Sequence, residues 1–263
     1  MIDFFSSSLK GKTFIFRLDP RVKFISLIII FVSLLLVKHV EYYLFWLFIA
    51  TITIFSNKIH LKFIVRPMRF FVWLFIMTII FHALFTPGRV VFHFNRIYIT
   101  FEGIEKGIFF SIRLFLIILF TYLFSLTTNP MDLTDGLSRL FSPLRKLRIP
   151  VDDLFIIIHI ALRFIPTMSE QSSRILMAQR ARGLNFNVKF TERIKHLSSL
   201  IIPVILLSIK RANELALALE ARWYHPGRKR TSFIKMSLKR IDFSIIAIVL
   251  ISTGGILFCE ILR

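Results

Sequence analysis

The sequence has one cysteine, Cys259, and no His or Cys arrangement with the spacing of a metal site. A disulfide framework and a cysteine-based metal centre are therefore excluded as explanations of the fold. The phosphate-binding pattern GxxxxGK[ST] and the catalytic patterns HExxH and GxSxG are also missing from the sequence. We therefore expect no catalytic site, no metal site and no cofactor bound by this chain.

Acidic residues are scarce, with 15 Asp and Glu against 35 Lys and Arg, which gives a net charge of +20. Such a charge suits nucleic acid, but its placement favours another explanation. If the N-terminus is cytosolic, the short inner segments carry nine Lys and Arg and the short outer segments carry four. This asymmetry follows the positive-inside rule for membrane proteins. The charge therefore predicts a cytosolic N-terminus and no nucleic-acid partner.

Apolar residues make up 56% of the chain, whereas soluble domains contain about 45–50%. The long apolar runs predict an all-α membrane protein with about five transmembrane helices, and no removable signal peptide is expected. We expect an N-terminal membrane domain over residues 1–126, with spans near 22–37, 42–56, 69–86 and 106–126. A C-terminal transmembrane helix is expected over residues 241–263.

Turn and cap residues divide the membrane part of the sequence. Asp19 with Pro20, and Asn129 with Pro130, each predict a capped helix start. Between them we expect three connections: a tight turn at Lys38–Glu41, a basic loop over Asn57–Arg69, and a hairpin formed by Val90–Phe94 and Arg96–Phe101.

Residues 127–240, between the fourth and fifth predicted spans, have a different character. Helical segments here are separated by Pro143, Pro150, Gly183 and Pro226-Gly227. The apolar runs Leu154–Leu162 and Leu200–Leu207 are too short to cross about 30 Å of hydrocarbon. We therefore expect a cytosolic or interfacial domain of long helices that lie along or under the inner membrane face.

Two helices of this domain end with the same pattern, Ala-x-x-Ala-Arg. One reads Ala178-Gln179-Arg180-Ala181-Arg182-Gly183, and the other reads Ala218-Leu219-Glu220-Ala221-Arg222-Trp223. Alanines three apart share a helix face, and an Arg at the helix end offers a rigid fork of five donors. A single copy is explained by an Arg that complements the helix dipole. Two copies favour two equivalent sockets on a two-fold partner such as an ATPase dimer.

Several motifs, in order along nearly the whole chain, resemble those of the transmembrane T component (EcfT) of energy-coupling factor transporters. They are Arg17-Leu18-Asp19-Pro20-Arg21, Glu102-Gly103, Thr127-Thr128-Asn129-Pro130, Ala161-Leu162-Arg163-Phe164-Ile165-Pro166 and the two Arg-bearing helix ends. The resemblance implies a non-catalytic coupling subunit of an ABC-type importer of vitamins or metal ions, in a prokaryotic cytoplasmic membrane. It also implies two ATPase subunits that bind ATP and Mg²⁺, and a separate substrate-binding membrane (S) subunit.

In the EcfT family, each arginine of two Ala-Arg-Gly motifs docks in a groove of one ATPase subunit. The resemblance gives this role to Ala181, Arg182, Gly183, Ala221 and Arg222, with supporting contacts from Ala178, Ala218 and Trp223. Gly183 can adopt the left-handed conformation that ends a helix. Trp223 stands where the family has a small residue, which argues against a left-handed cap at that end. Its indole is expected to pack against the ATPase or the membrane surface.

Two rival functions use other residues. An intramembrane enzyme would require His82, His159 or the Asp152-Asp153 pair to converge on a substrate, although the two aspartates are also explained as the start of a helix. Arg113, inside an apolar run, is explained by interhelical hydrogen bonding or snorkelling. A scaffold or lipid-surface protein would bind anionic lipid through the basic cytosolic helices and have no ATPase partner. The run Arg228-Lys229-Arg230 is explained by anionic lipid, by an ATPase contact or by a solvated charged surface.

Overall fold

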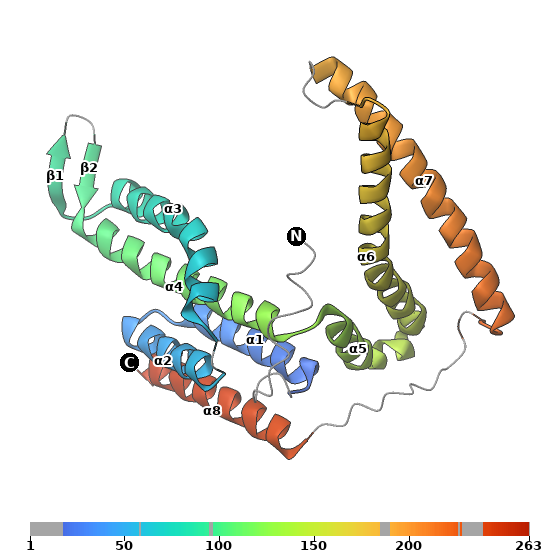
Figure 1. The fold of residues 1–263 in the computed structure, drawn as a ribbon. Coiled ribbons are helices and arrows are strands. Elements are labelled where there is room, and N and C mark those ends of the chain that lie inside the picture. Colours follow the sequence, from blue (N-terminus) through green and yellow to red (C-terminus); the bar gives the residue numbers. More distant parts are fainter. Residues whose placement is uncertain are drawn as a thin grey trace. The chain divides into compact units, whose positions relative to one another are not determined.

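A computed structural model describes residues 18–57, 59–94, 97–184, 190–225, 227 and 239–262 (Figure 1). The helices are α1 (Pro20–Leu36), α2 (Val40–Ser56), α3 (Leu61–Phe85), α4 (Phe101–Thr127), α5 (Pro130–Leu140), the 3₁₀ helix η3 (Ser142–Leu147), α6 (Val151–Ala181), α7 (Phe190–Ala221) and α8 (Arg240–Leu262). Two short strands, β1 (Val90–Phe94) and β2 (Ile97–Thr100), form a hairpin between α3 and α4. The predicted all-α fold is confirmed.

The chain divides into two compact units. One contains α1 to α4, the hairpin and α8, and the other contains η3, α6 and α7, with the boundary inside α5. The predicted boundaries at residues 126 and 241 divide the chain by location, into membrane and cytosolic parts, whereas the two compact units are divided by their internal contacts. The predicted boundaries therefore stay predictions.

Three of the described helices are long and apolar enough to cross a membrane: α3, α4 and the Arg240–Glu260 part of α8. The chain is therefore a multi-pass membrane protein. Helices α1 and α2 have 17 residues each, roughly 26 Å at 1.5 Å per residue. The count of five spans stays a prediction, because these two helices would cross only with local thinning of the bilayer.

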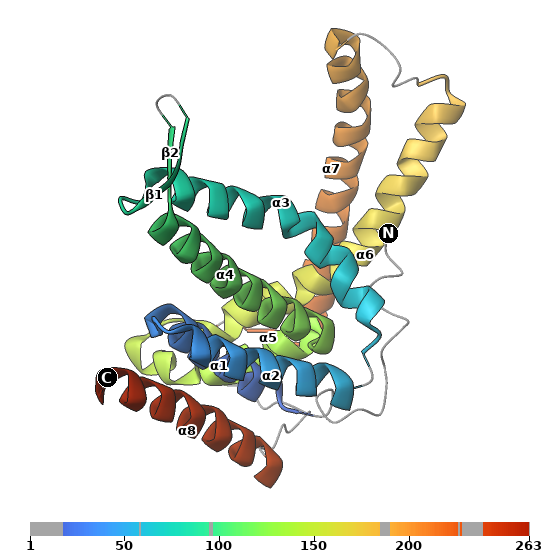
Figure 2. The same ribbon diagram turned by 90° about the vertical axis from the view of Figure 1, so that its left-hand side faces the viewer.

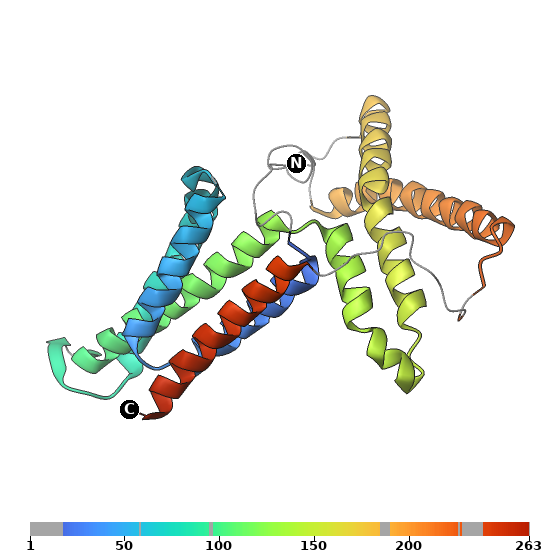
Figure 3. The ribbon, with the colours of Figure 1, turned by 90° about the horizontal axis from the view of Figure 1, so that it is seen from below.

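The first and last helices lie side by side (Figure 3). Asp19 caps α1 as predicted: Pro20 is the first helical residue, and the Asp19 carboxylate accepts the N–H of Arg21 at 3.0 Å. Asp242, which is 2% exposed, accepts the N–H of Lys239 at 2.7 Å and the N–H of Asp19 at 3.3 Å. A single buried carboxylate therefore closes the start of α8 and joins it to the start of α1.

The basic loop predicted over Asn57–Arg69 is wrong, because α3 begins at Leu61 and continues through Pro67. Ile64 and Met68 are buried and lie four residues apart on one face of the helix. The exposed Lys and Arg of this segment obscured that apolar stripe in the sequence. The shorter turn predicted at Lys38–Glu41 is confirmed, although Glu41 already belongs to the first turn of α2.

Helix α4 packs closely against α3 because two glycines face it. A Cβ atom added to Gly103 would lie 2.6 Å from the carbonyl oxygen of His82 and 2.9 Å from Cα of Ala83. A Cβ atom added to Gly107 would lie 2.9 Å from Cα of Ile79. Small residues allow two membrane helices to approach backbone to backbone. The Glu102-Gly103 motif therefore has a packing role.

The predicted hairpin is confirmed as an antiparallel pair, with Val90 opposite Thr100 and Phe94 opposite Ile97. Thr100 also caps α4, since its Oγ1 accepts the N–H of Gly103 at 3.2 Å. The same hydroxyl donates to the carbonyl oxygen of Thr86 at 2.7 Å, just after α3. Thr100 thus ties the hairpin to both neighbouring helices.

Helix α5 begins as predicted, with the Asn129 side chain accepting the N–H of Met131 at 3.2 Å. Helices α6 and α7 have 31 and 32 residues and are continuous through Pro166 and Pro203. The two short apolar runs are therefore parts of longer helices, as expected. Helix α7 runs back from the end of α6 toward its start (Figure 2). The place of these helices at the membrane face stays a prediction.

Candidate functional site

The first candidate site is the C-terminal end of α6. Gly183 has a φ of +91°, which confirms the predicted left-handed cap. Its N–H donates to the carbonyl oxygen of Arg180 at 3.0 Å, and the N–H of Leu184 donates to that of Gln179 at 3.0 Å. This pair of bonds is the Schellman arrangement, which satisfies carbonyls that the helix leaves unpaired. Arg182 is the last residue before the reversal of the chain.

The C-terminal end of α7 repeats this arrangement forty residues later. The N–H of Trp223 donates to the carbonyl oxygen of Glu220 at 2.9 Å, and the N–H of Tyr224 donates to that of Leu219 at 3.0 Å. Trp223 has a φ of +57°, so the expectation that a left-handed cap would not form here is wrong. A non-glycine residue in this conformation costs roughly 1–2 kcal/mol. The hydrogen bonds of the cap hold the residue there.

All eight predicted site residues are exposed to solvent. They are Ala178, Ala181, Arg182, Gly183, Ala218, Ala221, Arg222 and Trp223, and the Trp223 side chain is 83% exposed. Within the described ranges, neither the Arg182 nor the Arg222 guanidinium makes a hydrogen bond or an ion pair. Each helix end therefore presents a small alanine face and a guanidinium that is free to bind a partner.

Asp153, which the sequence explains as part of a helix start and which the enzyme hypothesis places at a substrate site, connects α6 to the chain just after α7. The Asp153 carboxylate accepts the hydroxyl of Tyr224 at 3.2 Å and the backbone N–H of Gly227 at 2.9 Å. The neighbouring Asp152 instead pairs with Arg145. No local signal distinguishes these two aspartates, because the partners of Asp153 lie 71 and 74 residues away in the sequence.

The residues required by the enzyme hypothesis have separate surroundings. His82 stacks on Phe110, with ring centroids 4.6 Å apart. His159 lies near Asp135, with 3.8 Å between Nδ1 and Oδ1. In the part of the chain that the structure describes, no three His, Cys, Asp or Glu side chains are grouped to hold a metal ion. None of the contacts of these histidines assembles a reactive group with a base.

Arg113 has a structural explanation. Its Nη2 donates to the carbonyl oxygen of Val37 at 2.7 Å, and its Nε donates to the hydroxyl of Tyr43 at 2.8 Å. Val37 follows the last residue of α1, so the cation lies where the helix dipole is negative. The guanidinium also lies 5.1 Å from each ring centroid of Phe109 and Phe110. Interhelical hydrogen bonding, one of the two predicted explanations, is confirmed.

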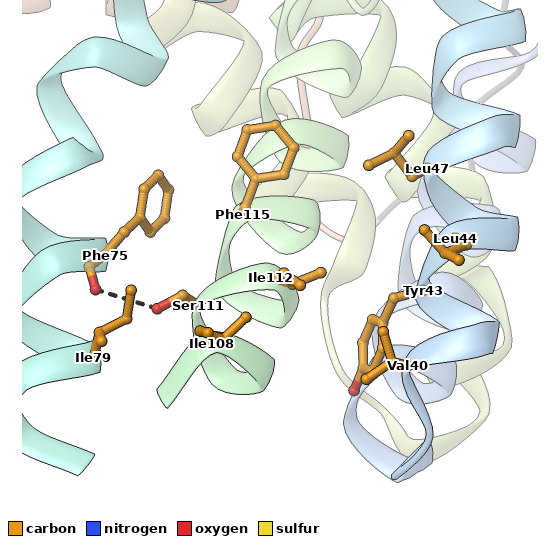
Figure 4. A pocket seen from close by; sticks show the side chains of 10 residues that line it. All are labelled: Val40, Tyr43, Leu44, Leu47, Phe75, Ile79, Ile108, Ser111, Ile112 and Phe115. Carbon is orange, nitrogen blue, oxygen red and sulfur yellow. Dashed lines mark hydrogen bonds between the residues drawn. The ribbon is translucent and has the colours of Figure 1, made fainter. Parts of the chain in front are cut away.

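A groove with a volume of about 360 Å³ lies among α2, α3 and α4 (Figure 4). Its walls are apolar, with Leu44 and Leu47 on one side and Phe75 and Phe115 on others. The Ser111 hydroxyl at its edge already donates to the carbonyl oxygen of Phe75 at 3.2 Å. The groove offers apolar contact and no reactive group.

Three parts of the predicted motifs cannot be placed. Arg17, Pro226 and the Arg228-Lys229-Arg230 run lie outside the described residues. The predicted roles of these residues stay predictions.

Residues 11–233 match a family model described as cobalt transport protein (CbiQ). The energy-coupling factor transporter transmembrane protein EcfT of Bacillus subtilis is 36% identical over 254 residues, which is 94% of each chain. The protein of the same name from Thermanaerovibrio acidaminovorans is 34% identical over 244 residues, 92% of this chain and 91% of that one. The one from Brevibacillus brevis is 37% identical over 250 residues, 93% and 94% of the two chains. The chain therefore belongs to the EcfT family, the transmembrane T components of energy-coupling factor transporters.

Proposed function

We propose that this T component couples two ATPase subunits to a substrate-binding membrane (S) subunit for the import of a vitamin or a metal ion. In this proposal the ATPases bind ATP and Mg²⁺ and perform the hydrolysis, and this chain performs no chemistry. The ends of α6 and α7 dock in the ATPases through Ala181, Arg182, Gly183, Ala221 and Arg222. Ala178, Ala218 and Trp223 lie beside those contacts.

The observation that carries the proposal is that two helix ends share one cap geometry. Both have the same two backbone hydrogen bonds and a left-handed residue at the same position, and in both an exposed Arg precedes that residue. Two identical partner surfaces would each bind an arginine that is held in the same geometry at a helix end. The planar guanidinium, with its five donors, suits carboxylates and buried interfaces. The two equivalent ends therefore fit a twin-subunit ATPase.

The proposal places the N-terminus and both helix ends in the cytosol of a prokaryotic cell. In the sequence, nine Lys and Arg before or at the first predicted span and between Lys58 and Arg69 would then face the cytosol, and four would face the other side. Residues 127–240 then lie on the N-terminal side because four spans precede them. This is the compartment where ATP is available to a docked ATPase.

The proposed mechanism uses α6 and α7 as levers. ATP binding brings the two ATPases together and displaces the helix ends docked in them. Each helix is continuous over more than thirty residues. A displacement of its docked end is therefore passed along the rest of the helix. The motion reaches the S subunit through apolar surfaces and changes its tilt or releases it.

The test is a double charge reversal, Arg182→Glu with Arg222→Glu, in the assembled transporter. We expect loss of ATPase co-purification and of substrate uptake, because each carboxylate would face a groove that binds a cation. Arg174→Glu with Lys210→Glu is the matched control, since both side chains are exposed on the same helices away from their ends. Replacing both docking arginines with Ala is expected to weaken assembly only in part.

Unchanged assembly of the double-Glu variant would refute the docking role. A pull-down of the wild-type chain from native membranes addresses the scaffold alternative. Recovery of anionic lipid without any nucleotide-binding protein would support that alternative over the T-component mechanism.

A further inference from the structure

The Asp153 carboxylate uses its two oxygens for two different groups beyond the end of α7. Oδ1 accepts the phenolic hydroxyl of Tyr224, and Oδ2 accepts the backbone N–H of Gly227. Asp153 itself lies in the first turn of α6. One side chain thus fixes both ends of a four-residue stretch that begins two residues after Arg222.

Both contacts are hydrogen bonds to a carboxylate. Hydrogen bonds to an ionised carboxylate are about twice as strong as those between neutral groups. Asp153 also lies at the positive end of the α6 dipole, where a negatively charged side chain stabilises the helix. Asp152 shares that dipole but binds Arg145, within the connection that precedes α6. Asp153, in contrast, binds the chain that follows α7.

The conformation of Trp223 explains why this end of a helix needs a second support. A bulky residue with a φ of +57° persists only where its surroundings impose that conformation. On one side the carbonyl oxygens of Leu219 and Glu220 hold the cap. On the other side Asp153 holds the chain that follows it. At the end of α6 the same conformation belongs to Gly183, for which it is not strained.

We propose that Asp153 is a positioning residue for the second docking motif, which fixes the direction of the chain after α7 and thereby the presentation of Arg222. The inference rests on the proposed docking of Arg222 in an ATPase subunit. It also gives α6 a double role. This helix carries Arg182 at its C-terminal end and holds the second motif at its N-terminal end, roughly 46 Å apart for 31 residues.

Displacement of one ATPase subunit is then transmitted to the other docking motif along a single helix. Helix α6 links the two motifs, and the Asp153 carboxylate is the joint at one end. The first motif requires no such joint because it is the covalent continuation of α6.

The direct test is hydrogen–deuterium exchange of the full chain in lipid nanodiscs. We expect Asp153→Ala to accelerate exchange of the amides between Arg222 and Gly227 by about tenfold, and Tyr224→Phe by a smaller factor of about three. Asp152→Ala is the matched control, because it removes an equal charge from the same helix turn. Tyr122→Phe controls for the loss of a phenolic hydroxyl. Unchanged exchange in Asp153→Ala, or equal acceleration in Asp152→Ala, would overturn the inference.

The assembled transporter supplies the readout that a merely structural role would not change. We expect Asp153→Ala to retain the ATPases, because both docking arginines are still present, and to lower the substrate imported per ATP hydrolysed by several-fold. Asp152→Ala is expected to keep the wild-type ratio, and a wild-type ratio in Asp153→Ala would contradict the positioning role. If the double variant Arg182→Glu with Arg222→Glu leaves ATPase binding intact, the docking proposal fails, while the exchange result still decides the joint at Asp153.

Discussion

Glycine serves two different physical purposes in the two compact units of this protein. In the unit that contains α3 and α4, Gly103 and Gly107 have helical backbones, and no space exists for a side chain. In the unit that contains α6 and α7, Gly183 has open space within 4 Å of its virtual Cβ atom but has a left-handed backbone. At Gly103 and Gly107 the packing requires a residue without a side chain. At Gly183 the cap requires a residue that adopts a positive φ.

The difference shows how each unit is stabilised. Close contact between α3 and α4 depends on backbones that approach each other, so the packing tolerates no added atom. The ends of α6 and α7 depend on hydrogen bonds at the cap, and these form with a glycine and with a tryptophan alike. Substitutions at the two kinds of position should therefore differ in size and even in sign.

Gly103→Val should have the largest effect. The added atoms would meet the backbone of α3 at His82 and Ala83, which cannot move without displacing the helix. We expect a loss of about 3 kcal/mol and a clear drop in the melting temperature of the detergent-solubilised chain. Gly103→Ala should lose less, and a melting temperature equal to that of the wild type in both variants would refute the close contact.

Gly183→Ala should have an intermediate effect of about 1 kcal/mol. Alanine fits the space but not the φ of +91°. The loss should be local, so the measurement is faster exchange of the Gly183 and Leu184 amides with little change in melting temperature. Gly183→Asn provides the control, because asparagine tolerates the left-handed region better than alanine does.

Trp223→Gly should stabilise the end of α7, whereas the two preceding substitutions destabilise the protein. It removes the strain of a left-handed tryptophan and loses little packing, since that side chain is 83% exposed. The greater freedom of glycine in the unfolded chain offsets part of the gain, which leaves up to about 1 kcal/mol of local stabilisation. Slower exchange of the Tyr224 amide would show it, and faster exchange would mean that the indole itself supports the cap.

Gly254→Ala should have the smallest effect, a gain of about 0.5 kcal/mol, because alanine favours a helix more than glycine does. Gly254 lies in α8, has a helical backbone and has nothing within 4 Å of its virtual Cβ atom. It therefore lacks both requirements that the other glycines have. A marked decrease in the melting temperature of the purified chain would show that glycine has a third role at this position.

Sequence reasoning succeeded where the cause and its effect lie close together in the chain. The caps at Asp19 and Asn129, the hairpin, and the reversal at Gly183 each depend on residues within a few positions. The paired helix ends were found because they repeat the same residues forty positions apart. The predicted ATPase-docking residues lie on exposed helix ends, and their docking stays a prediction.

The failures have physical causes. The start of α3 was assigned to a loop because its basic residues suggest an exposed connection. Only Ile64 and Met68, four residues apart, form the buried face of the helix there. The cap at Trp223 was rejected because residue type alone cannot reveal support from Asp153, which lies 71 residues before Tyr224. Gly103 was noted as part of a motif, but its contact with α3 depends on packing that no local pattern encodes.

The carboxylate of Asp242 imposes an order on biosynthesis. It accepts the N–H of Asp19, which is made 223 residues earlier. At about 5–20 residues per second, the ribosome needs roughly 10–45 s to produce the acceptor. The N–H of Asp19 therefore lacks this acceptor until the start of the last helix has been made. Synthesis halted before Asp242 would leave a nascent chain whose opening segment still lacks its neighbour.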